Sequence, residues 1–453
     1  MNLSGVNHIH FVGVGGVGMS AIAKVLLEQG REISGSDMKR SRAFTTLEAM
    51  GADLRLGHDA AAIEGADLVV VSSAIPEGNP ELKAAREQGL QVVSRGEALA
   101  AVLAGSKSIA VAGTHGKTTT TSMIVSIMEK ASLDPTYLVG GGLNDAGTNA
   151  RFGRGEYSVA ESDESDGSFL LLSPYIGVVT NVEPDHLDYW GTFAAIEEAF
   201  ERFIGAIDPA GASVLPVSEE RLVSQARSRV ITFGPGGDVD FDNAEVSTDG
   251  TRFDLSVGGD VRRVMLRVPG EHNVANALAA AAAGLAAGVD VDAIATGLES
   301  YRGVERRFQV RGTAAGVTVI DDYAHHPTEV RSTLAAAKSG GWTRVLAVFQ
   351  PHRYSRTAHF SEAFGAAFAE ADVIVITDVY GAGEEPVPGV TGKLVVDAIC
   401  TNLPGRAVAY LPHRDDLIGY LTRTARPGDA LLTLGAGDVT SVGEELLARL
   451  EAV

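Results

Sequence analysis

Two glycine-rich turns in this sequence have the composition of phosphate-binding loops. The first spans residues 13–20 and carries Gly15, Gly16 and Gly18 between an apolar segment and a helical pattern. Glycines let bare backbone N–H groups approach a ligand, and the positive end of the following helix attracts anions. We therefore predict a diphosphate site here, with Asp37 at the end of the next strand in the position of a ribose-binding acid. Taken alone, this signature is also typical of NAD-binding domains.

The second turn reads Gly-Thr-His-Gly-Lys-Thr-Thr-Thr over residues 113–120. Such a loop supplies backbone donors, a lysine for the β- and γ-phosphates of a nucleotide, and a hydroxyl for Mg2+. Val111 stands where the common P-loop pattern has glycine, so we expect a tighter loop. The predicted ATP-binding residues of this turn are Gly113, Thr114, His115, Gly116, Lys117, Thr118 and Thr119.

Two potential metal ligands follow apolar segments further along the chain. Glu161 stands in YSVAESDESDGSF, and His186 stands in IGVVTNVEPDHLDYW. A parallel sheet binds its ligand at the carboxyl ends of its strands, so a carboxylate and a neutral imidazole there are placed to complete Mg2+ sites beside a triphosphate. Asp163, Glu164 and Asp166 rank lower, because an acidic loop of this kind is often only a solvated surface.

A further group of polar residues ends two later strands. The segment DDYAHHP follows one strand, and QPHRYSR follows the next. Both segments should face the same crevice, where Arg353 and Arg356 can each hold a carboxylate or phosphate through two parallel hydrogen bonds. His325 and His326 also fit helix capping or packing, and we predict no zinc site from them.

Parallel sheets are needed to position these residues, and the chain has the pattern for such sheets. From residue 8 onward, short apolar runs alternate with longer helical patterns, which indicates a βαβ series. A Gly- and Asp-rich stretch over 234–269 is expected to add antiparallel strands before the alternation restarts at VTVIDDYAHH. We predict an α/β protein of three domains: a Rossmann-like domain (1–105), a P-loop ATPase-like domain with a mixed sheet (106–311) and a second Rossmann-like domain (312–453).

The composition restricts the class of protein. The 453 residues exceed what one hydrophobic core usually organises. Their 58 acidic and 37 basic side chains give a formal charge of -21, so no nucleic-acid partner is expected. Cys400 is the only cysteine, which excludes an intramolecular disulfide or a cysteine-rich zinc site. No leader pattern or membrane-spanning run is found, so we expect a cytoplasmic enzyme without membrane insertion, monomeric or homodimeric.

Motifs in all three predicted domains resemble those of the Mur ligase family, in the family's order. They are GVGGVGMS, SGSD, VVVSSAI, GTHGKTTT, ESDESDGSF, TNVEPDHLDYW, GEHNVANA, ERRF, DDYAHHPTEV and FQPHRYSRT. The resemblance implies an N-terminal domain that holds a UDP-sugar, a central domain that holds ATP, and a C-terminal domain that closes over the ATP and binds the amino acid. The activity that it implies is ligation of L-alanine to the lactyl carboxylate of UDP-N-acetylmuramate in peptidoglycan precursor synthesis, with ATP and Mg2+.

The resemblance also implies roles for individual residues. The first glycine turn would cradle the diphosphate of UDP rather than NAD. The implied UDP-sugar ligands are Gly15, Gly16, Gly18, Asp37, Ser72, Ser73, Arg353 and Arg356. The implied additions to the ATP site are Asn276, Arg307 and Asp322, and those to the L-alanine site are Tyr323, His325 and His326. The catalytic set is Lys117, Glu161, His186 and His352, and the metal ligands are Thr118, Glu161 and His186.

The implied chemistry requires no protein nucleophile. The lactyl carboxylate attacks the γ-phosphate of ATP to give an acyl phosphate and ADP, and the alanine amine then attacks the acyl carbon. Lys117, Mg2+ and backbone N–H groups stabilise the transferring charge, and either His352 or a neighbouring carboxylate accepts the proton of the amine. The alternatives are a related ligase that attaches a recycled peptide to the same sugar, an NAD-dependent dehydrogenase, and a non-catalytic nucleotide-binding scaffold.

One position departs from the wider family, whose later-acting members carry a carbamylated lysine that helps to hold a second Mg2+. The segment DHLDYWGTFAAIEEAF aligns with theirs without gaps and has Phe200 at that position. Because phenylalanine cannot be carbamylated, a second metal would depend on phosphate oxygens, water, His186 or a nearby acid. The acids considered are Glu197, Glu198 and Glu201.

Overall fold

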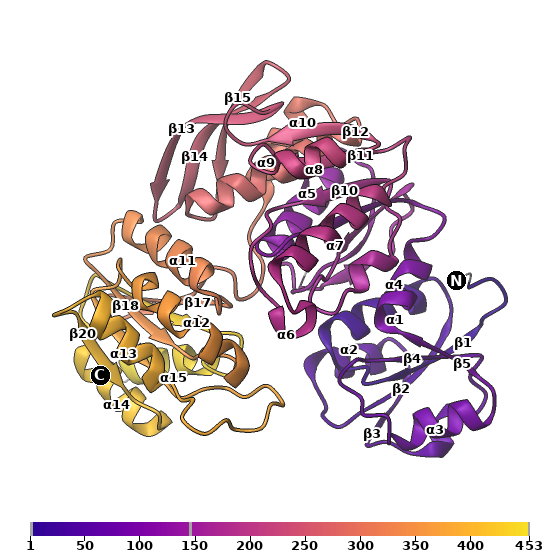
Figure 1. The fold of residues 1–453 in the computed structure, drawn as a ribbon, viewed down its shortest axis with the longest axis horizontal. Helices are drawn as coiled ribbons and strands as arrows, with labels where there is room; N and C mark the ends of the chain where they lie inside the picture. The colour runs from indigo at the N-terminus through magenta and orange to yellow at the C-terminus, as the bar shows by residue number, and fades with distance from the viewer. Residues whose placement is uncertain (1–2, 145–146, 452–453) are drawn as a thin grey trace. The chain divides into compact units, whose positions relative to one another are not determined.

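The computed structural model describes residues 3–144 and 147–451, which form two compact units (Figure 1). The first unit comprises the described residues up to Phe241 together with Leu255–Arg262 and Asn276–Tyr301. The second comprises Asp242–Asp254, Arg263–Ala275 and the described residues from Arg302 onward. Within the described ranges, no helix is both long enough and apolar enough to cross a membrane.

A five-stranded parallel sheet opens the first unit. Its elements in chain order are β1 (His8–Val12), α1 (Val17–Glu28), β2 (Glu32–Asp37), α2 (Arg42–Ala49), β3 (Asp53–Leu56), the 3-10 helix η1 (Ala60–Ile63), β4 (Leu68–Val71), α3 (Pro80–Glu87), β5 (Gln91–Ser94) and α4 (Arg95–Leu103). The strand order is β3-β2-β1-β4-β5, so the chain reverses its progression across the sheet next to β1. The first glycine turn follows β1 and therefore lies at a topological switch point, where such sheets bind ligands.

A ten-stranded mixed sheet follows. Its elements are β6 (Lys107–Ala112), α5 (Lys117–Lys130), β7 (Thr136–Leu138), β8 (Ala150–Arg151), β9 (Tyr157–Glu161), η2 (Ser168–Leu171), β10 (Ile176–Val179), α6 (Leu187–Trp190), α7 (Phe193–Gly205), β11 (Ala212–Pro216), α8 (Glu220–Gln225), β12 (Arg229–Phe233), β13 (Val239–Ser247), β14 (Gly250–Val257), β15 (Asp260–Leu266), α9 (Glu271–Ala286) and α10 (Val291–Ser300). The strand order is β15-β14-β13-β12-β11-β10-β6-β9-β7-β8. Because β6 lies between β10 and β9, parallel to both, the second glycine turn is flanked by the segments that follow these two strands.

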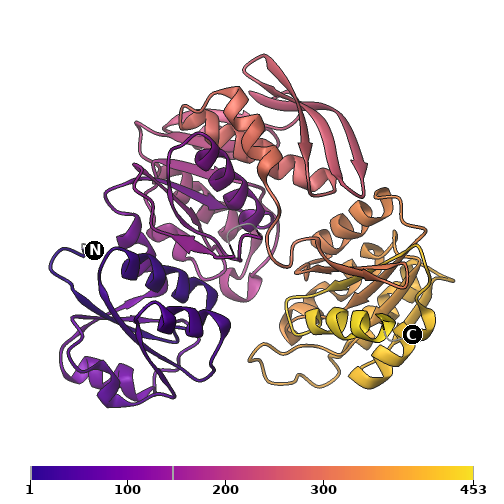
Figure 2. The ribbon, with the colours of Figure 1, turned by 180° about the vertical axis from the view of Figure 1, so that it is seen from behind.

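The strands β13, β14 and β15 form one edge of this sheet and are seen from behind in Figure 2. They confirm that the stretch over 234–269 adds strands to the central sheet, but β13 pairs with β12 in parallel, where antiparallel strands were predicted. At the other edge β8 runs antiparallel to β7, so the sheet is mixed, as predicted.

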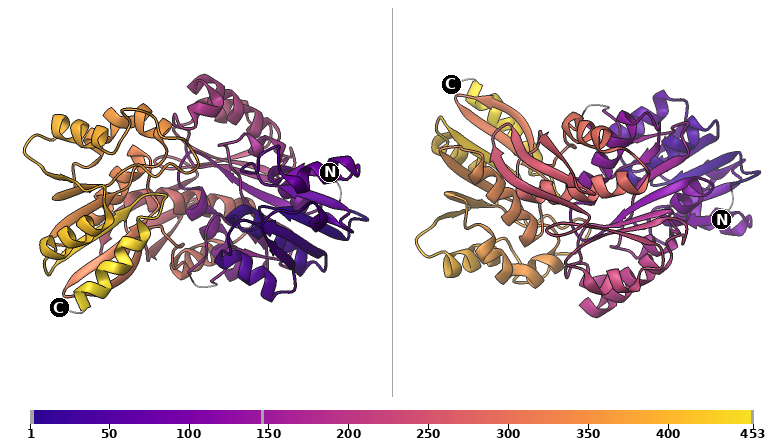
Figure 3. Two further views of the ribbon diagram at one scale, coloured as in Figure 1. Left: turned by 90° about the horizontal axis from the view of Figure 1, so that it is seen from below. Right: turned by 90° about the horizontal axis from the view of Figure 1, so that it is seen from above.

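The second unit contains a six-stranded sheet. Its elements are β16 (Gln309–Ala314), β17 (Val317–Asp322), α11 (Pro327–Ser339), β18 (Arg344–Phe349), α12 (Tyr354–Ala367), β19 (Val373–Ile376), α13 (Lys393–Asn402), β20 (Ala407–Tyr410), α14 (Arg414–Thr424), β21 (Asp429–Leu434) and α15 (Thr440–Glu451). The strand order is β16-β17-β21-β18-β19-β20, with β16 antiparallel to β17. Residues of α11, α12 and α13 share one buried cluster with the sheet, and residues of α14 and α15 share another, so helices cover both faces (Figure 3).

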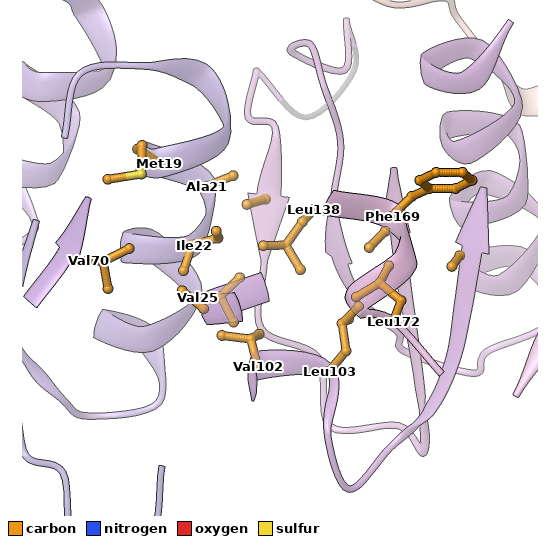
Figure 4. Packing of buried hydrophobic residues seen from close by; sticks show 14 of the residues in the cluster. Met19, Ala21, Ile22, Val25, Val70, Val102, Leu103, Leu138, Phe169 and Leu172 are labelled. Atoms are coloured by element: carbon orange, nitrogen blue, oxygen red, sulfur yellow. The ribbon is translucent and has the colours of Figure 1, made fainter. Parts of the chain in front are cut away.

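One hydrophobic core joins the first sheet to the central sheet within the first unit. Ile22 and Val25 of α1 and Leu103 of α4 belong to the same buried cluster as Leu138 of β7 and Phe169 of η2 (Figure 4). Burying a side chain of this size contributes about 1.5–3 kcal/mol, so a cluster of this extent holds the two sheets together. Both glycine turns are therefore carried by one body.

The predicted fold class is confirmed, because the described residues form three sheets with helices between their strands, in the expected order of strand, turn and helix. The proposed boundaries at residues 105 and 311 stay predictions. One local expectation differs from the structure. His186 does not end a strand: β10 stops at Val179, and His186 is the N-cap of α6 with a left-handed φ of 52°.

Candidate functional site

Polar groups of β2 hold the first glycine turn between β1 and α1. The N–H groups of Gly13 and Val14 donate to the carbonyl of Ser36 at 2.9 and 3.0 Å. Oδ2 of Asp37 accepts the N–H of Gly15 at 2.9 Å, and a Cβ on Gly15 would lie 2.9 Å from the same oxygen. Asp37 thus fixes the turn, and its contact with a ribose stays a prediction.

The segment that follows β4 lies against the other side of this turn. Gly13 has a φ of +85°, which favours glycine, and a Cβ there would lie 3.2 Å from Cβ of Ser72. Ser73 is exposed beside it. Gly16 caps α1, and Gly18 lies in the first turn of that helix. The structure thus gathers the predicted N-terminal UDP-sugar ligands around one turn, although their contact with a ligand stays a prediction.

Sequence reasoning missed Arg95, at the start of α4. Its Nη1 atom lies 3.1 Å from the place that a Cβ on Gly18 would occupy. Its Nη2 atom donates to Asp163 at 3.1 Å and to Asp166 at 3.2 Å. The guanidinium therefore connects α4 with the acidic loop after β9 and lies close to Gly18 of α1. A spacing of 68 residues between Arg95 and Asp163 gives no local signal for this contact.

The second glycine turn is tightly enclosed. Gly113 has a φ of +132°, and a Cβ there would lie 2.0 Å from Oγ1 of Thr180. Gly116 has a φ of +80°, and a Cβ there would lie 2.2 Å from Oδ1 of Asn276. The His115 N–H donates to Oδ1 of Asn181 at 2.9 Å, which anchors the turn to the segment after β10. Only glycine fits at these two positions, and Asn276 is placed directly on the turn.

Lys117, the first residue of α5, makes a buried ion pair. Its Nζ atom donates to the carbonyl of Gly113 at 2.6 Å and to Oε1 of Glu164 at 2.8 Å. Burial lowers the pKa of Lys117, but the charges of Glu164, Asp163 and Glu161 outweigh this effect, so the pKa lies above its usual value. Burial raises the pKa of Glu164 to about 7 despite the nearby lysine. A protonated lysine therefore lies where the turn would bind phosphate.

A hydroxyl, a carboxylate and an imidazole lie next to this lysine. Oγ1 of Thr118 donates to Oε1 of Glu161 at 3.1 Å, and Oε2 of Glu161 accepts the N–H of Gly140 at 2.8 Å. Nε2 of His186 lies 3.5 Å from Oδ2 of Asp185 and 3.8 Å from Oε1 of Glu164. Thr118 and Glu161 offer the oxygen donors that Mg2+ prefers, whereas His186 offers a nitrogen, and the assignment of all three as metal ligands stays a prediction. The carboxylates of Glu164 and Asp185 also lie at this point. The sequence analysis ranked Glu164 low and did not single out Asp185.

The glutamates of α7 either pair with Arg221 or are exposed, whereas Glu164 pairs with Lys117. Glu197 lies 3.3 Å from Arg221, and Glu201 is also paired with Arg221, at the contact of α7 with α8. Glu198 is exposed. Phe200 is fully buried and packs on Phe169 with ring centroids 5.2 Å apart, so its position belongs to the hydrophobic core.

In the second unit, a row of rings follows the carboxyl ends of β17 and β18. The ring centroids of Tyr323 and His325 are 5.4 Å apart, those of His325 and His352 are 5.6 Å apart, and those of His352 and Tyr380 are 5.8 Å apart. The guanidinium groups of Arg306 and Arg307 lie 5.0 and 5.2 Å from the centroid of Tyr323. The structure therefore brings the predicted Tyr323, His325 and His352 together, as expected for segments at the same end of the sheet.

His326 and Asp322, two other predicted residues of this unit, accept hydrogen bonds from backbone N–H groups. His326 is the N-cap of α11 and accepts the N–H of Thr328 at 3.3 Å, so the capping interpretation of this histidine is confirmed. Asp322 is buried and accepts the N–H groups of Phe308 and Ala324, both at 2.7 Å. Burial raises the pKa of Asp322 to about 6. The roles of both residues in ligand binding stay predictions.

Cationic groups surround the two neighbouring histidines. Burial, together with the charges of Arg356 and Arg353, lowers the pKa of His352 to about 4. Burial also lowers the pKa of His325, to about 3, although Glu329 opposes this shift. Both imidazoles are therefore neutral at neutral pH. Arg353 has a φ of 65° and a ψ of 140°, a backbone conformation that side-chain-bearing residues rarely adopt.

Comparison with protein families gives matches along most of the chain. The models described as "Mur ligase family, catalytic domain", "Mur ligase middle domain" and "Mur ligase, glutamate ligase domain" match residues 8–107, 111–284 and 306–437. A curated UDP-N-acetylmuramate--L-alanine ligase from Pelotomaculum thermopropionicum is 47% identical and is aligned over 98% of each chain. Another from Rubrobacter xylanophilus is also 47% identical, over 98% of this chain and 100% of its own.

Solved structures give the same result. The UDP-N-acetylmuramate-alanine ligase of Thermotoga maritima is 30% identical with a TM-score of 0.83, over 98% of this chain and 99% of its own. A murein peptide ligase from Psychrobacter arcticus is 27% identical with a TM-score of 0.73, over 99% of each chain. The similarity thus extends over all three sheets.

Proposed function

Because the chain belongs to the Mur ligase family, we propose that it joins L-alanine to the lactyl carboxylate of UDP-N-acetylmuramate, with conversion of ATP to ADP and phosphate. The observation that carries this proposal is the presence of two enclosed glycine turns in one unit, one at a switch point and one with Lys117. Curated relatives with this activity in their names align over almost the whole chain. The enzyme is thus a ligase of peptidoglycan precursor synthesis.

The two turns serve different substrates in this proposal. The turn at Gly13 to Gly18 holds the diphosphate of the UDP-sugar, with Asp37, Ser72 and Ser73 around it. The turn at Gly113 to Thr119 holds the phosphates of ATP, and Asn276 lies near the nucleotide. The buried core between the two sheets then fixes the spacing between the sugar and the γ-phosphate. Fixed spacing favours attack by the lactyl carboxylate, because productive orientation lowers the barrier.

Lys117 stabilises the charge that develops on the transferring phosphoryl group. Its ammonium already lies beside the carbonyl of Gly113, within the turn that would hold the β- and γ-phosphates. Thr118, Glu161 and His186 would hold Mg2+, with Glu164 next to them. When bound, the metal neutralises phosphate charge. The acyl phosphate that forms is then attacked by the amine of L-alanine.

The second unit supplies the amino-acid side of the reaction. Tyr323, His325 and His326 belong to the L-alanine site in this proposal, and Arg353 and Arg356 hold carboxylates. Either His352 or a neighbouring carboxylate accepts the proton that the alanine ammonium must lose; His352 is neutral at neutral pH, but its pKa of about 4 makes it a weak base. Arg307 and Asp322 approach the nucleotide. The three-domain division at residues 105 and 311 is part of the same proposal.

The decisive experiment measures phosphate release from ATP by the purified protein. UDP-N-acetylmuramate plus L-alanine should give rapid release, and either substrate alone, or chelation of Mg2+, should give almost none. Competition between L-alanine and a recycled tripeptide distinguishes this activity from that of a murein peptide ligase. Reduction of NAD without consumption of ATP would overturn the proposal.

A further inference from the structure

α3 contributes a buried carboxylate to the first sheet. Glu81 has 0% of its surface exposed and lies in the first turn of α3. Its own N–H donates at 2.9 Å to Oδ1 of Asn79, the N-cap of the helix. Glu81 lies outside both glycine turns and outside the motifs at the strand ends. Its burial therefore requires a separate explanation.

Groups from three other segments converge on this carboxylate. Oε2 of Glu81 accepts hydrogen bonds from Nε2 of His10 at 3.0 Å and from the hydroxyl of Ser36 at 2.6 Å. Oε1 accepts the N–H of Asp59 at 3.0 Å and lies 3.4 Å from Nδ1 of His58. The carboxylate thus connects β1, β2 and the loop after β3.

Electrostatics keeps the carboxylate charged in this position. Burial raises the pKa of Glu81, but the hydrogen bonds from His10 and Ser36, the charge of His10 and the Asp59 N–H more than offset this, so the pKa lies below its usual value. A buried carboxylate of this kind adds little net stability, because the cost of desolvation offsets most of the gain from its partners. What the network does supply is fixed geometry, since each partner must hold its hydrogen bond to avoid an unsatisfied buried group.

The residues held by Glu81 are those that hold the first glycine turn. Ser36 accepts the N–H groups of Gly13 and Val14 through its carbonyl while its hydroxyl donates to Glu81. The next residue, Asp37, accepts the N–H of Gly15. A shift of Ser36 would therefore move three consecutive backbone contacts of the turn.

We propose that Glu81 is a positioning residue for the UDP-sugar, which acts through the hydroxyl of Ser36 on the backbone of the first glycine turn. The inference rests on the proposed function of that turn as the diphosphate site. It implies that the binding of UDP-N-acetylmuramate depends on a carboxylate that does not touch the ligand, while the binding of ATP does not depend on it.

The test compares the wild-type protein with Glu81→Gln and Ser36→Ala. Isothermal titration measures the dissociation constants of UDP-N-acetylmuramate and of a non-hydrolysable ATP analogue, and steady-state assays measure kcat and each KM. Both variants should weaken UDP-N-acetylmuramate binding about tenfold, because the backbone donors of the turn lose their fixed positions; this change corresponds to about 1.4 kcal/mol of binding free energy. The ATP analogue should bind as in the wild type, and kcat at saturating sugar should change less than KM.

The double variant Glu81→Gln with Ser36→Ala tests the path of the effect. If Glu81 acts through Ser36, the double variant should bind the sugar no more weakly than the worse single variant. Additive losses would contradict this path. Ser36→Ala removes only one hydroxyl, so it keeps the test valid should Glu81→Gln unfold, as judged by circular dichroism.

Glu77→Gln is the matched control. Glu77 precedes α3, is exposed and pairs with Arg86 on the surface. Its replacement should leave sugar binding unchanged. Normal sugar binding by Glu81→Gln and Ser36→Ala, with a wild type that binds the sugar, would overturn the inference alone. A wild-type protein that does not bind UDP-N-acetylmuramate would instead overturn the proposed function on which the inference rests.

Discussion

Nζ of Lys117 donates a hydrogen bond to Oε1 of Glu164 at 2.8 Å, and the same carboxylate oxygen lies 3.8 Å from Nε2 of His186. The three side chains come from α5, the loop after β9 and the start of α6. Glu164 thus connects the cation of the phosphate turn with a predicted metal ligand. The pair makes Lys117 both part of the proposed catalysis and the partner of a buried acid.

Lys117→Ala should lower the rate of phosphate release by at least about 100-fold, because the lysine acts on charge that develops at the transferring phosphate. The variant should stay folded, as circular dichroism would show. Lys130→Ala, in the last turn of the same helix and exposed, is the control and should keep full activity. Near-normal turnover by Lys117→Ala would show that the central sheet does not bind ATP in the proposed way.

Activity should not depend on dissolved CO2. Phe200 is fully buried among aromatic rings, so no lysine stands at this position to be carbamylated. Assays in decarbonated buffer, with and without added bicarbonate, should give rates that agree within error. A strong, reversible loss of activity without CO2, or a carbamate carbon signal in 13C NMR, would contradict this prediction.

Arg353→Gly should stabilise the fold while it impairs catalysis. The backbone of Arg353, with φ 65° and ψ 140°, costs about 1–3 kcal/mol for a residue with a side chain. Glycine relieves this strain but loses about 0.5–1 kcal/mol through its more flexible unfolded state, so a net gain of about 1 kcal/mol is expected. Chemical denaturation measures the gain. Arg353→Ala removes the same guanidinium without relieving the backbone, so it should impair catalysis equally and show no such gain.

Arg356→Ala should weaken the handling of UDP-N-acetylmuramate or L-alanine more than that of ATP. Arg356 has 9% of its surface exposed, and its charge lowers the pKa values of His325 and His352. The KM values for UDP-N-acetylmuramate, L-alanine and ATP show which substrate the variant handles less well. Titration by NMR tests the electrostatic effect, because loss of the Arg356 charge should raise the pKa of His352. An unchanged pKa of His352 would show that the charge of Arg356 does not act on this histidine.

His352 should make the protein less stable in mild acid. The pKa of His352 is about 4 in the folded chain, whereas the ordinary histidine value of 6.5 applies to the unfolded chain. Between these values the unfolded chain binds more protons, so the contribution of His352 to the free energy of unfolding falls as pH falls from 6.5 to about 4. His352→Gln should lose stability less steeply over this window. His413→Gln, at an exposed histidine, should follow the wild type.

The elements that carry the site follow from local sequence patterns. Apolar runs such as LVVV and RVLAVF are buried on both faces of parallel sheets, which is why β4 and β18 were predictable from the sequence. Lys117 and the glycines of both turns were predictable as well, because their spacing is set by the backbone that must surround a phosphate. The order of motifs also gave the fold class and the family.

Only the tertiary structure decided which distant residues meet. Arg95 contacts Asp163, Glu164 contacts Lys117, and Glu81 contacts Ser36, over sequence separations of 68, 47 and 45 residues. Such contacts depend on strand order and helix packing, which leave no periodic signal in the sequence. The adjacent histidines at 325 and 326 illustrate the same limit: the direction of the backbone at the start of α11 makes one a helix cap and turns the other toward His352. The residues that can do chemistry were therefore set by the sequence, and their partners were set by the packing of the sheets.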